Sequence, residues 1–350
     1  MKNNQKLIDK LNINNILSEG EFIQLLSTYD DKDFLYAKSL AQNITQRVFG
    51  NKIYIRALIE FTNYCKNNCY YCGIQNSNTN INRYRLTLEY IMECCQIAYN
   101  NDFRTFVLQG GEDPYFTQEK MIKIIQEIKF KYPDCALTLS IGEKSKEEYE
   151  AYYKAGTNRF LLRHETANDC HYSLLHPATM TLENRKNCLY NLKEIGFTTG
   201  AGMMIGSPFQ KIKYLAKDLV FLGEFNPHMV GMGPFIPHKD TVFHDKPTGS
   251  LRLTLFLISI IRIMLKNVLL PATTALATID KNGRELGILH GANVVMPNVS
   301  PTEKRKEYSL YDNKLSEGAE AGENLKKLES KLSTIGYEIS YDIGNWTKKL

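Results

Sequence analysis

The chain has 350 residues, of which 43% are hydrophobic and 23% charged, a composition typical of a soluble globular protein with a large core. Its net charge of +5 is spread along the sequence, without the basic block that would indicate nucleic-acid binding. The longest apolar run, residues 253–261, is far shorter than the ~20 residues of a membrane span, and the polar start lacks the apolar segment of a secretory signal. We therefore expect a cytoplasmic protein, no membrane or nucleic-acid partner, and cysteines that stay reduced.

The order of helical and extended patterns predicts an α/β protein. Residues 1–50 carry apolar residues at helical spacing and are expected to form an N-terminal helical extension. Over residues 51–300, short apolar runs alternate with amphipathic stretches. Residues 301–350 are expected to form a C-terminal extension that packs on the domain of residues 51–300 and has a helix near 324–334. The expected strands are 52–61, 105–111, 136–142, 159–165, 198–206, 229–236, 271–277 and 292–298. This alternation matches a (β/α)8 TIM-type barrel, with a doubly wound open sheet as the alternative.

Three cysteines follow the first expected strand in a C-x3-C-x2-C arrangement, Cys65, Cys69 and Cys72. In a barrel this is the first loop at the carboxyl ends of the strands, where barrel enzymes build their active sites. Four thiolates would close a zinc site or fully ligate a cubane cluster, whereas three leave one iron of a 4Fe–4S cluster open to another ligand. The alternatives are a zinc site completed by a distant histidine and three incidental cysteines.

Polar residues near the ends of later strands indicate a second part of the site. Alternate residues of a barrel strand point inward, so Arg159, Arg163 and Glu165 share one face of "RFLLRHE". Buried charges are costly unless they are paired or liganded, so this face predicts an inner binding site; the alternative is a reversed register that exposes the charges to solvent. Hydroxyl groups that could line the same cavity, although each is also consistent with an ordinary core position, belong to Thr138, Ser140, Thr273 and Thr274.

The stretch "QGGEDP" closes the second expected strand. Gly110 and Gly111 allow the backbone to come close to a ligand, and Glu112 can accept hydrogen bonds from an ammonium group. Alone, this stretch would be an ordinary turn. After the cysteine loop of a barrel, it indicates a ligand contact.

The cysteine spacing, with the aromatic Tyr71 just before the last cysteine, resembles the radical S-adenosylmethionine (SAM) enzymes. The stretches "VLQGGEDPY", "RHETAN", "TTGAGMMIG" and "GPFIPH" further resemble the HydE family of FeFe-hydrogenase maturases, over about residues 50–311. The resemblance implies one 4Fe–4S cluster whose open iron binds SAM. It also implies an external electron donor and reductive cleavage of SAM to methionine and a 5′-deoxyadenosyl radical.

The resemblance also implies residue roles. The cluster ligands would be Cys65, Cys69 and Cys72. The SAM contacts would be Tyr71 near the adenine, Gln109, Gly110, Gly111 and Glu112 at the methionyl end, Glu165 at the ribose and Arg185 at the carboxylate. The lining of an anion-binding substrate cavity would be Arg159, Arg163, Thr138, Thr273, Thr274, Tyr308 and Tyr311. Those expected to act in catalysis are Glu165, Arg159, Arg163 and Tyr308.

The implied substrate is a small iron–cysteine complex carrying CO and cyanide, made by a companion radical SAM maturase. The implied product passes to a GTPase scaffold that assembles the hydrogenase H-cluster. Some members of the family bind a second cluster through cysteines near the C-terminus. Here the last cysteine is Cys188, and "DNKLSEGAEAGENLKK" offers no thiol, so we expect no second cluster.

Three other functions stay open from the sequence. One is a methylornithine synthase-like mutase of the same subgroup. Another is a biotin synthase-like enzyme, which needs a second cluster held by strand cysteines; Cys135 lies at the wrong end of its strand for that role. The third is a non-catalytic iron–sulfur carrier, which would need the three cysteines but not Glu112, Glu165 or Arg185.

Overall fold

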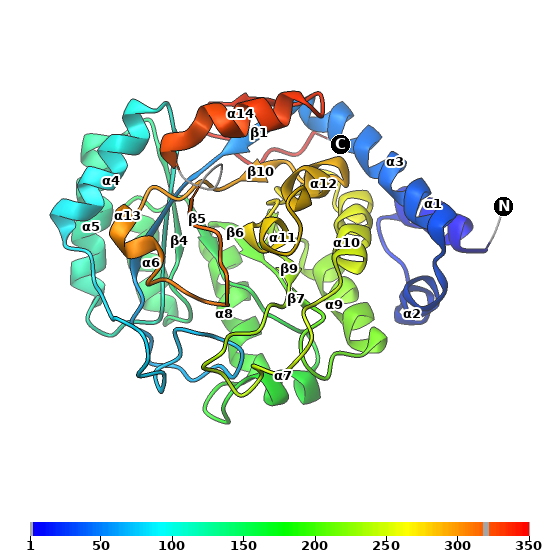
Figure 1. The fold of residues 1–350 in the computed structure, drawn as a ribbon, viewed down its shortest axis with the longest axis horizontal. Helices are drawn as coiled ribbons and strands as arrows, with labels where there is room; N and C mark the ends of the chain where they lie inside the picture. Colours follow the sequence, from blue (N-terminus) through cyan, green and yellow to red (C-terminus); the bar gives the residue numbers. More distant parts are fainter. Residues whose placement is uncertain (1–2, 318–321, 350) are drawn as a thin grey trace.

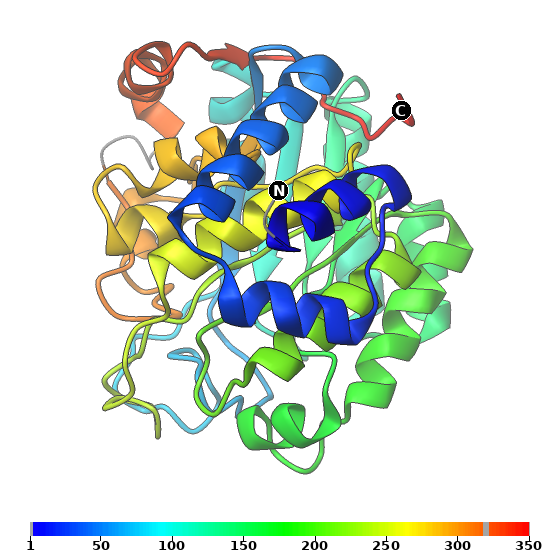
Figure 2. The ribbon, with the colours of Figure 1, turned by 90° about the vertical axis from the view of Figure 1, so that its right-hand side faces the viewer.

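The computed structural model describes residues 3–317 and 322–349. Three helices come first, α1 (Asn3–Asn14), α2 (Glu19–Thr28) and α3 (Asp31–Phe49). Capping boxes begin α2 at Ser18 and α3 at Asp30, since each side chain accepts from the N3 amide while the N3 carboxylate accepts in return. Figure 2 shows the three helices along one flank of the molecule, where α2 packs on α9 (Ile212–Phe225) and α3 on α10 (Leu251–Met264).

A parallel sheet forms most of the barrel wall. Its strand order is β2-β3-β4-β5-β6-β8, with bounds Ala57–Thr62, Thr105–Gly110, Ala136–Ser140, Arg159–Leu161, Thr198–Ala201 and Met229–Val230. Parallel bridges from Met229 to Leu269, from Pro271 to Val294 and from Leu58 to Asn298 carry the wall back to β2. The predicted (β/α)8 barrel is therefore confirmed, and the open-sheet alternative is wrong.

Helices follow the strands in sequence, as the predicted alternation requires. They are α4 (Leu88–Asn100), α5 (Gln118–Lys131), α6 (Lys146–Lys154), α8 (Leu182–Ile195), α9 and α14 (Leu325–Ser333). Shorter elements include α7 (Asp169–Leu175), α11 (Thr274–Ile279), α12 (Gly283–Leu289), α13 (Thr302–Arg305), β7 (Met204–Ile205), β9 (Gly233–Pro234) and β10 (Val294–Val295). The expected strand 271–277 is wrong from Thr274 onward. Thr273 is extended and is the N-cap of α11, in which the adjacent Ala275 and Leu276 are both buried instead of alternating between two faces as in a strand.

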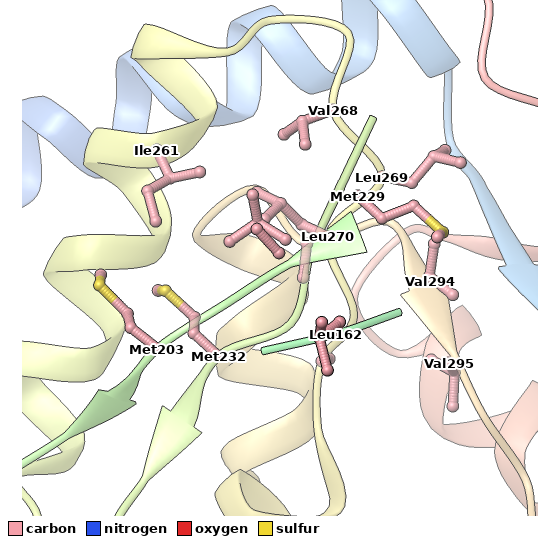
Figure 3. Close-up of a cluster of buried hydrophobic side chains, with 14 of the residues drawn as sticks. Leu162, Met203, Met229, Met232, Ile261, Val268, Leu269, Leu270, Val294 and Val295 are labelled. Atoms are coloured by element: carbon pink, nitrogen blue, oxygen red, sulfur yellow. The ribbon is translucent and has the colours of Figure 1, made fainter. Parts of the chain in front are cut away.

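The most apolar stretch of the sequence forms the buried helix α10. In Figure 3, Ile261 of this helix points toward three residues of the barrel, Met203, Met232 and Leu270. All four side chains are buried. The apolar run is therefore explained by its position between α3 and the barrel, and no helix of the described residues is long and apolar enough to cross a membrane.

The two ends of the barrel are built differently. At the amino ends of the strands, β1 (Lys52–Ile55) pairs with β10 and with β11 (Glu338–Ser340), and the residues after β11 run on to the C-terminus. In Figure 1, β1 and α14 lie along the upper edge and α7, which follows β5, lies at the lower edge. The loops at this lower, carboxyl end carry the three neighbouring cysteines.

Candidate active site

A cavity of about 340 Å³ lies at the carboxyl ends of the strands. It is bordered by the loop after β2, the turn after β3, the end of β5 and the segment after α13. The predicted site residues that line it are Cys65, Cys69, Tyr71, Cys72, Gln109, Gly110, Gly111, Glu112, Arg163, Glu165, Arg185, Thr273, Thr274, Tyr308 and Tyr311. The structure therefore brings together residues from six separate stretches of the sequence.

The cluster loop, residues 63–78, has no regular helix or strand and is held in shape by one arginine. The Arg83 guanidinium donates to the carbonyls of Asn63 (2.5 Å), Ile74 (2.9 Å), Gln75 (2.6 Å) and Asn78 (3.0 Å). Because a guanidinium carries five N–H donors in one plane, a single side chain can join both ends of the loop. The chain's own hydrogen bonds therefore join the two ends of the loop.

The three thiols fit an iron–sulfur cluster. Each is free and partly exposed to the same cavity. Burial raises the pKa of Cys65, Cys69 and Cys72, to about 12 for Cys72, and the neighbouring thiols raise the pKa of Cys69 and Cys72 further. A bound cationic cluster would replace the protons and remove this cost. Within residues 3–317 and 322–349, no three His, Cys, Asp or Glu side chains converge as they would on a single ion. All three thiols line one cavity, as the ligands of one cluster would.

The turn after β3 lies directly against the cluster loop. A Cβ on Gly111 would come 2.1 Å from the Tyr64 carbonyl oxygen, so only glycine fits at this approach. Glu112 is 7% exposed, and its Oε1 accepts from the amide of Glu143 at 3.0 Å. Its Oε2 faces the Lys66 ammonium at 3.4 Å, and the Lys66 side chain is 53% exposed. A ligand ammonium could therefore take the place of this solvent-exposed lysine.

The alternation predicted for "RFLLRHE" holds in part. Leu161, Arg163 and Glu165 line the cavity, while Phe160 and His164 pack outward on aromatic rings of the helices. Leu162, expected to face outward, also lines the cavity, and Arg159 does not. The inward charges compensate one another, because Arg163 Nη2 lies 2.9 Å from Glu165 Oε2. Glu165 holds a left-handed backbone, with φ of 64°, which is unusual for a residue with a side chain.

Arg185 completes the charged side of the cavity. Its Nε donates to Glu143 Oε1 at 2.5 Å, and its Nη1 donates to the Arg163 carbonyl at 2.7 Å. Arg185 therefore connects α8 to the end of β5. Its guanidinium is fixed by these two contacts at the cavity wall.

Two predicted residues lie deeper than the others. Arg159 and Thr138 are both buried inside the barrel, yet neither is among the residues that line the cavity. Arg159 instead donates to Thr105 Oγ1, to the Ile343 carbonyl and to Asn345 Oδ1. Burial lowers the pKa of Arg159 to about 10. The roles expected for Arg159 and Thr138 stay predictions. The Arg159 guanidinium already has hydrogen-bond acceptors within the protein.

The sequence prediction missed a buried ion pair that reaches the cavity from the C-terminal extension. Lys314 Nζ lies 2.5 Å from Glu60 Oε1, and Asn298 donates to Glu60 Oε2 at 2.7 Å. Lys314 and Glu60 both line the cavity. Glu60 could have been predicted, because it is a charged residue inside the apolar strand "ALIEF". The residues around Lys314 gave no such indication.

The segment that carries Lys314 lies across the cluster loop. The Leu310 carbonyl accepts from the Gly73 amide at 2.9 Å, and the Glu307 carbonyl accepts from Asn63 at 2.8 Å. Tyr308 and Tyr311 of this segment face the cavity. The C-terminal extension therefore supplies one wall of the site.

Comparison with known proteins agrees with this arrangement. The Radical SAM superfamily pattern matches residues 59–222. The FeFe hydrogenase maturase subunit HydE of Thermotoga maritima is 47% identical over 276 residues, which cover 79% of this chain and 78% of that protein. The chain belongs to the HydE family of radical SAM enzymes. Membership of this family implies a 4Fe–4S cluster and SAM, for which the residues described above are suited.

More distant relatives share the barrel with this HydE family member. The 3-methylornithine synthase of Methanosarcina acetivorans is 27% identical over 328 residues, covering 92% of this chain and 90% of that protein. The crystal structure of methylornithine synthase (PylB) superposes with a TM-score of 0.84 at 26% identity, covering 95% and 97% of the two chains. The maturase HydG superposes with a TM-score of 0.81 at 21% identity over 97% of this chain and 76% of its own, which supports the fold alone.

Proposed function

We propose that this chain acts in FeFe-hydrogenase maturation, by radical SAM chemistry on a small iron–cysteine complex that carries CO and cyanide. The observation that supports it most directly is the meeting of the three cysteines, Glu112 and Arg185 in one cavity. The 47% identity to the HydE of Thermotoga maritima supports a role in FeFe-hydrogenase maturation over other functions in the superfamily. A companion maturase would supply the complex, and a GTPase scaffold would accept the product.

The cofactors would be held by residues already placed at the cavity. Cys65, Cys69 and Cys72 would ligate the cluster. The cluster and SAM together would supply a strong one-electron reductant and a carbon-centred radical. Glu112 would accept hydrogen bonds from the SAM ammonium, and Arg185 would face its carboxylate. A reducing, cytoplasmic setting is part of the proposal, because these thiols must stay free to bind iron.

The lining divides into an apolar and a charged side, which fits the two ends of SAM. Tyr71, Met204 and Phe235 line the cavity and belong to one apolar cluster, so they could receive the adenine. The charged side, near Glu112 and Arg185, could receive the methionyl group. Glu165, at the end of β5, would bind the ribose.

The substrate would lie deeper in the cavity, beside unpaired polar atoms. Arg163 Nε and Thr273 Oγ1 are buried, line this space and have no hydrogen-bond partner within the described part of the chain. Buried polar atoms without a partner cost about 1–3 kcal/mol each, which a ligand carboxylate or cyanide could recover. Tyr308 and Thr274 complete this part of the lining.

The proposal is tested by reconstituting the cluster without oxygen and measuring two products. First, the reduced protein should convert SAM to 5′-deoxyadenosine. Second, it should restore hydrogen evolution to a maturation mixture that lacks its own HydE, with Cys65→Ala as the blank. SAM cleavage without hydrogen evolution would overturn the maturase function, and formation of 3-methylornithine would then identify the second candidate, which the PylB superposition favours.

We also propose that the chain binds a single cluster. The last cysteine is Cys188, so the C-terminal extension has no thiol; residues 318–321 of that stretch lie outside the described residues. Iron analysis of the reconstituted protein should give about four irons per chain. A clearly higher value, together with a second electron paramagnetic resonance signal, would contradict the single-cluster proposal.

A further inference from the structure

The cluster loop rests on a second segment, which begins with α7 and continues to Met180. The Tyr70 amide donates to the Leu175 carbonyl at 3.0 Å, and the next residue in this segment is His176. The His176 side chain is 1% exposed and lies between two tyrosines, Tyr71 of the cluster loop and Tyr172 of α7. It does not itself line the cavity.

The contacts of His176 fix its tautomer. Nδ1 lies 3.0 Å from the Tyr172 carbonyl oxygen, which can only accept, so Nδ1 carries the proton. Nε2 is then an acceptor and receives the Tyr71 hydroxyl hydrogen at 3.2 Å. Burial, followed by the nearby Arg185 charge, lowers the pKa of His176 to about 3, so the ring is neutral at physiological pH.

The rings of these three residues are fixed as well as their polar atoms. His176 stacks on Tyr172 with centroids 3.9 Å apart and an interplanar angle of 21°. The Tyr71 ring stands at 90° to His176, with centroids 5.4 Å apart. Tyr71 is therefore held by a hydrogen bond at its hydroxyl and by a ring contact, while its cavity side stays free for a ligand.

We propose that His176 is a positioning residue, which holds the Tyr71 ring as the wall that receives the nucleobase of SAM. The inference rests on the proposed function, because it takes SAM as the ligand of this cavity. The ring is well placed for this task, since Tyr71 packs with the apolar cluster of Met204 and Phe235 and precedes the cluster ligand Cys72. A free tyrosine would need to be ordered by the ligand, whereas a fixed one lowers the entropy cost of binding.

The alternative is that His176 only stabilises the fold. A positioning role should affect binding of the nucleoside part of SAM and leave binding of the methionine part unchanged. Methionine and 5′-deoxyadenosine can be measured separately as ligands, so the two roles can be distinguished. Three variants of the reconstituted protein separate them: Tyr71→Phe removes the hydroxyl, His176→Phe removes the acceptor, and His176→Gln keeps an acceptor near the position of Nε2. Tyr172→Phe is the matched control, since it removes a buried hydroxyl but keeps the carbonyl that His176 needs.

We expect Tyr71→Phe and His176→Phe each to weaken binding of SAM and 5′-deoxyadenosine about 3- to 10-fold, the effect of one hydrogen bond. Methionine affinity and iron content should not change. The double variant should be no weaker than either single variant, because both remove the same interaction. His176→Gln and Tyr172→Phe should stay within about twofold of the wild type.

Several results would overturn the inference. One is an equal loss of methionine and 5′-deoxyadenosine affinity, and another is a fully additive double variant. Unchanged nucleoside affinity in Tyr71→Phe would do the same even if His176→Phe failed to fold. A wild-type protein that binds neither SAM nor 5′-deoxyadenosine would instead refute the proposed function itself, and the two failures are therefore distinguishable.

Discussion

The two ends of the barrel bury arginines in different ways. At the amino end, Arg159 is fully buried and donates to neutral acceptors, including the Ile343 carbonyl and the Asn345 side chain. At the carboxyl end, Arg185 is 7% exposed and is paired with the Glu143 carboxylate. The first arginine is bound to the chain's own C-terminal residues, while the second borders a cavity.

This difference separates stability from function along the barrel axis. The amino end is closed by the chain itself, since Trp346 packs against His228 and β11 pairs with β1. The carboxyl end keeps a cavity of about 340 Å³ open, and its charges are paired around that volume. Barrel enzymes in general place catalysis at the carboxyl end and stability at the other, and substitutions at the two ends should therefore have different effects.

The largest effect is expected at the cluster loop. Cys72→Ala should reduce 5′-deoxyadenosine formation to background, because two thiols cannot hold the cluster in place. The thermal midpoint of the cluster-free protein should change little, since the Cys72 side chain is only partly buried. Cys170→Ala is the control, because this cysteine is exposed and does not line the cavity. Loss of activity in both variants would point to general damage rather than to a cluster ligand.

The second effect separates the two buried arginines. Arg159→Met should lower the free energy of unfolding by about 3 kcal/mol, because several buried acceptors lose their donor. Arg185→Met should mainly weaken SAM binding. Denaturant unfolding and SAM affinity, measured on both variants, give the comparison, with the half-exposed Arg252→Met as the surface control. Loss of SAM or substrate binding in fully folded Arg159→Met would instead support the catalytic role expected from the resemblance.

The sequence predicted the features that depend on neighbouring residues. The cysteine spacing, the "QGGE" turn and the inward parity of Arg163 and Glu165 all follow from local patterns, and all of these residues line the cavity. The pair of Lys314 with Glu60 joins residues 254 positions apart, so no local pattern reports it. The depth of Arg159 also depends on where the C-terminal residues cross the barrel, which strand alternation cannot give.

Helical spacing and strand patterns also compete in short segments. The stretch that begins at Pro271 has β-branched threonines, which favour a strand, yet the helix α11 begins at Thr274. The buried residues of this helix, Ala275 and Leu276, are adjacent in sequence and show neither pattern clearly, so tertiary packing decides between helix and strand. His176 was missed for a related reason, since its connection to the site is a contact with Tyr71, a residue 105 positions away.

The smallest effect on SAM chemistry is expected from buried histidines, which can be compared at the two ends. His290, which precedes β10, is 2% exposed and lies 2.9 Å from Ser259 Oγ through its Nδ1. Burial, together with the charge of Lys38, lowers its pKa to about 4. An unfolded histidine has a pKa of about 6.5, so between that pH and about 4 the unfolded chain binds the proton more readily than the folded one.

Stability should therefore fall as the pH is lowered through this window, by up to about 3 kcal/mol from His290 alone. His290→Gln should reduce the pH dependence of the unfolding free energy, measured by denaturant titration of the cluster-free protein at pH 7 and pH 4.5. SAM affinity at neutral pH should not change in this variant. His176→Phe provides the comparison at the carboxyl end, because it removes the acceptor of the Tyr71 hydroxyl and should weaken SAM binding about 3- to 10-fold. Equal effects of both variants on SAM affinity would contradict the separation of the two ends.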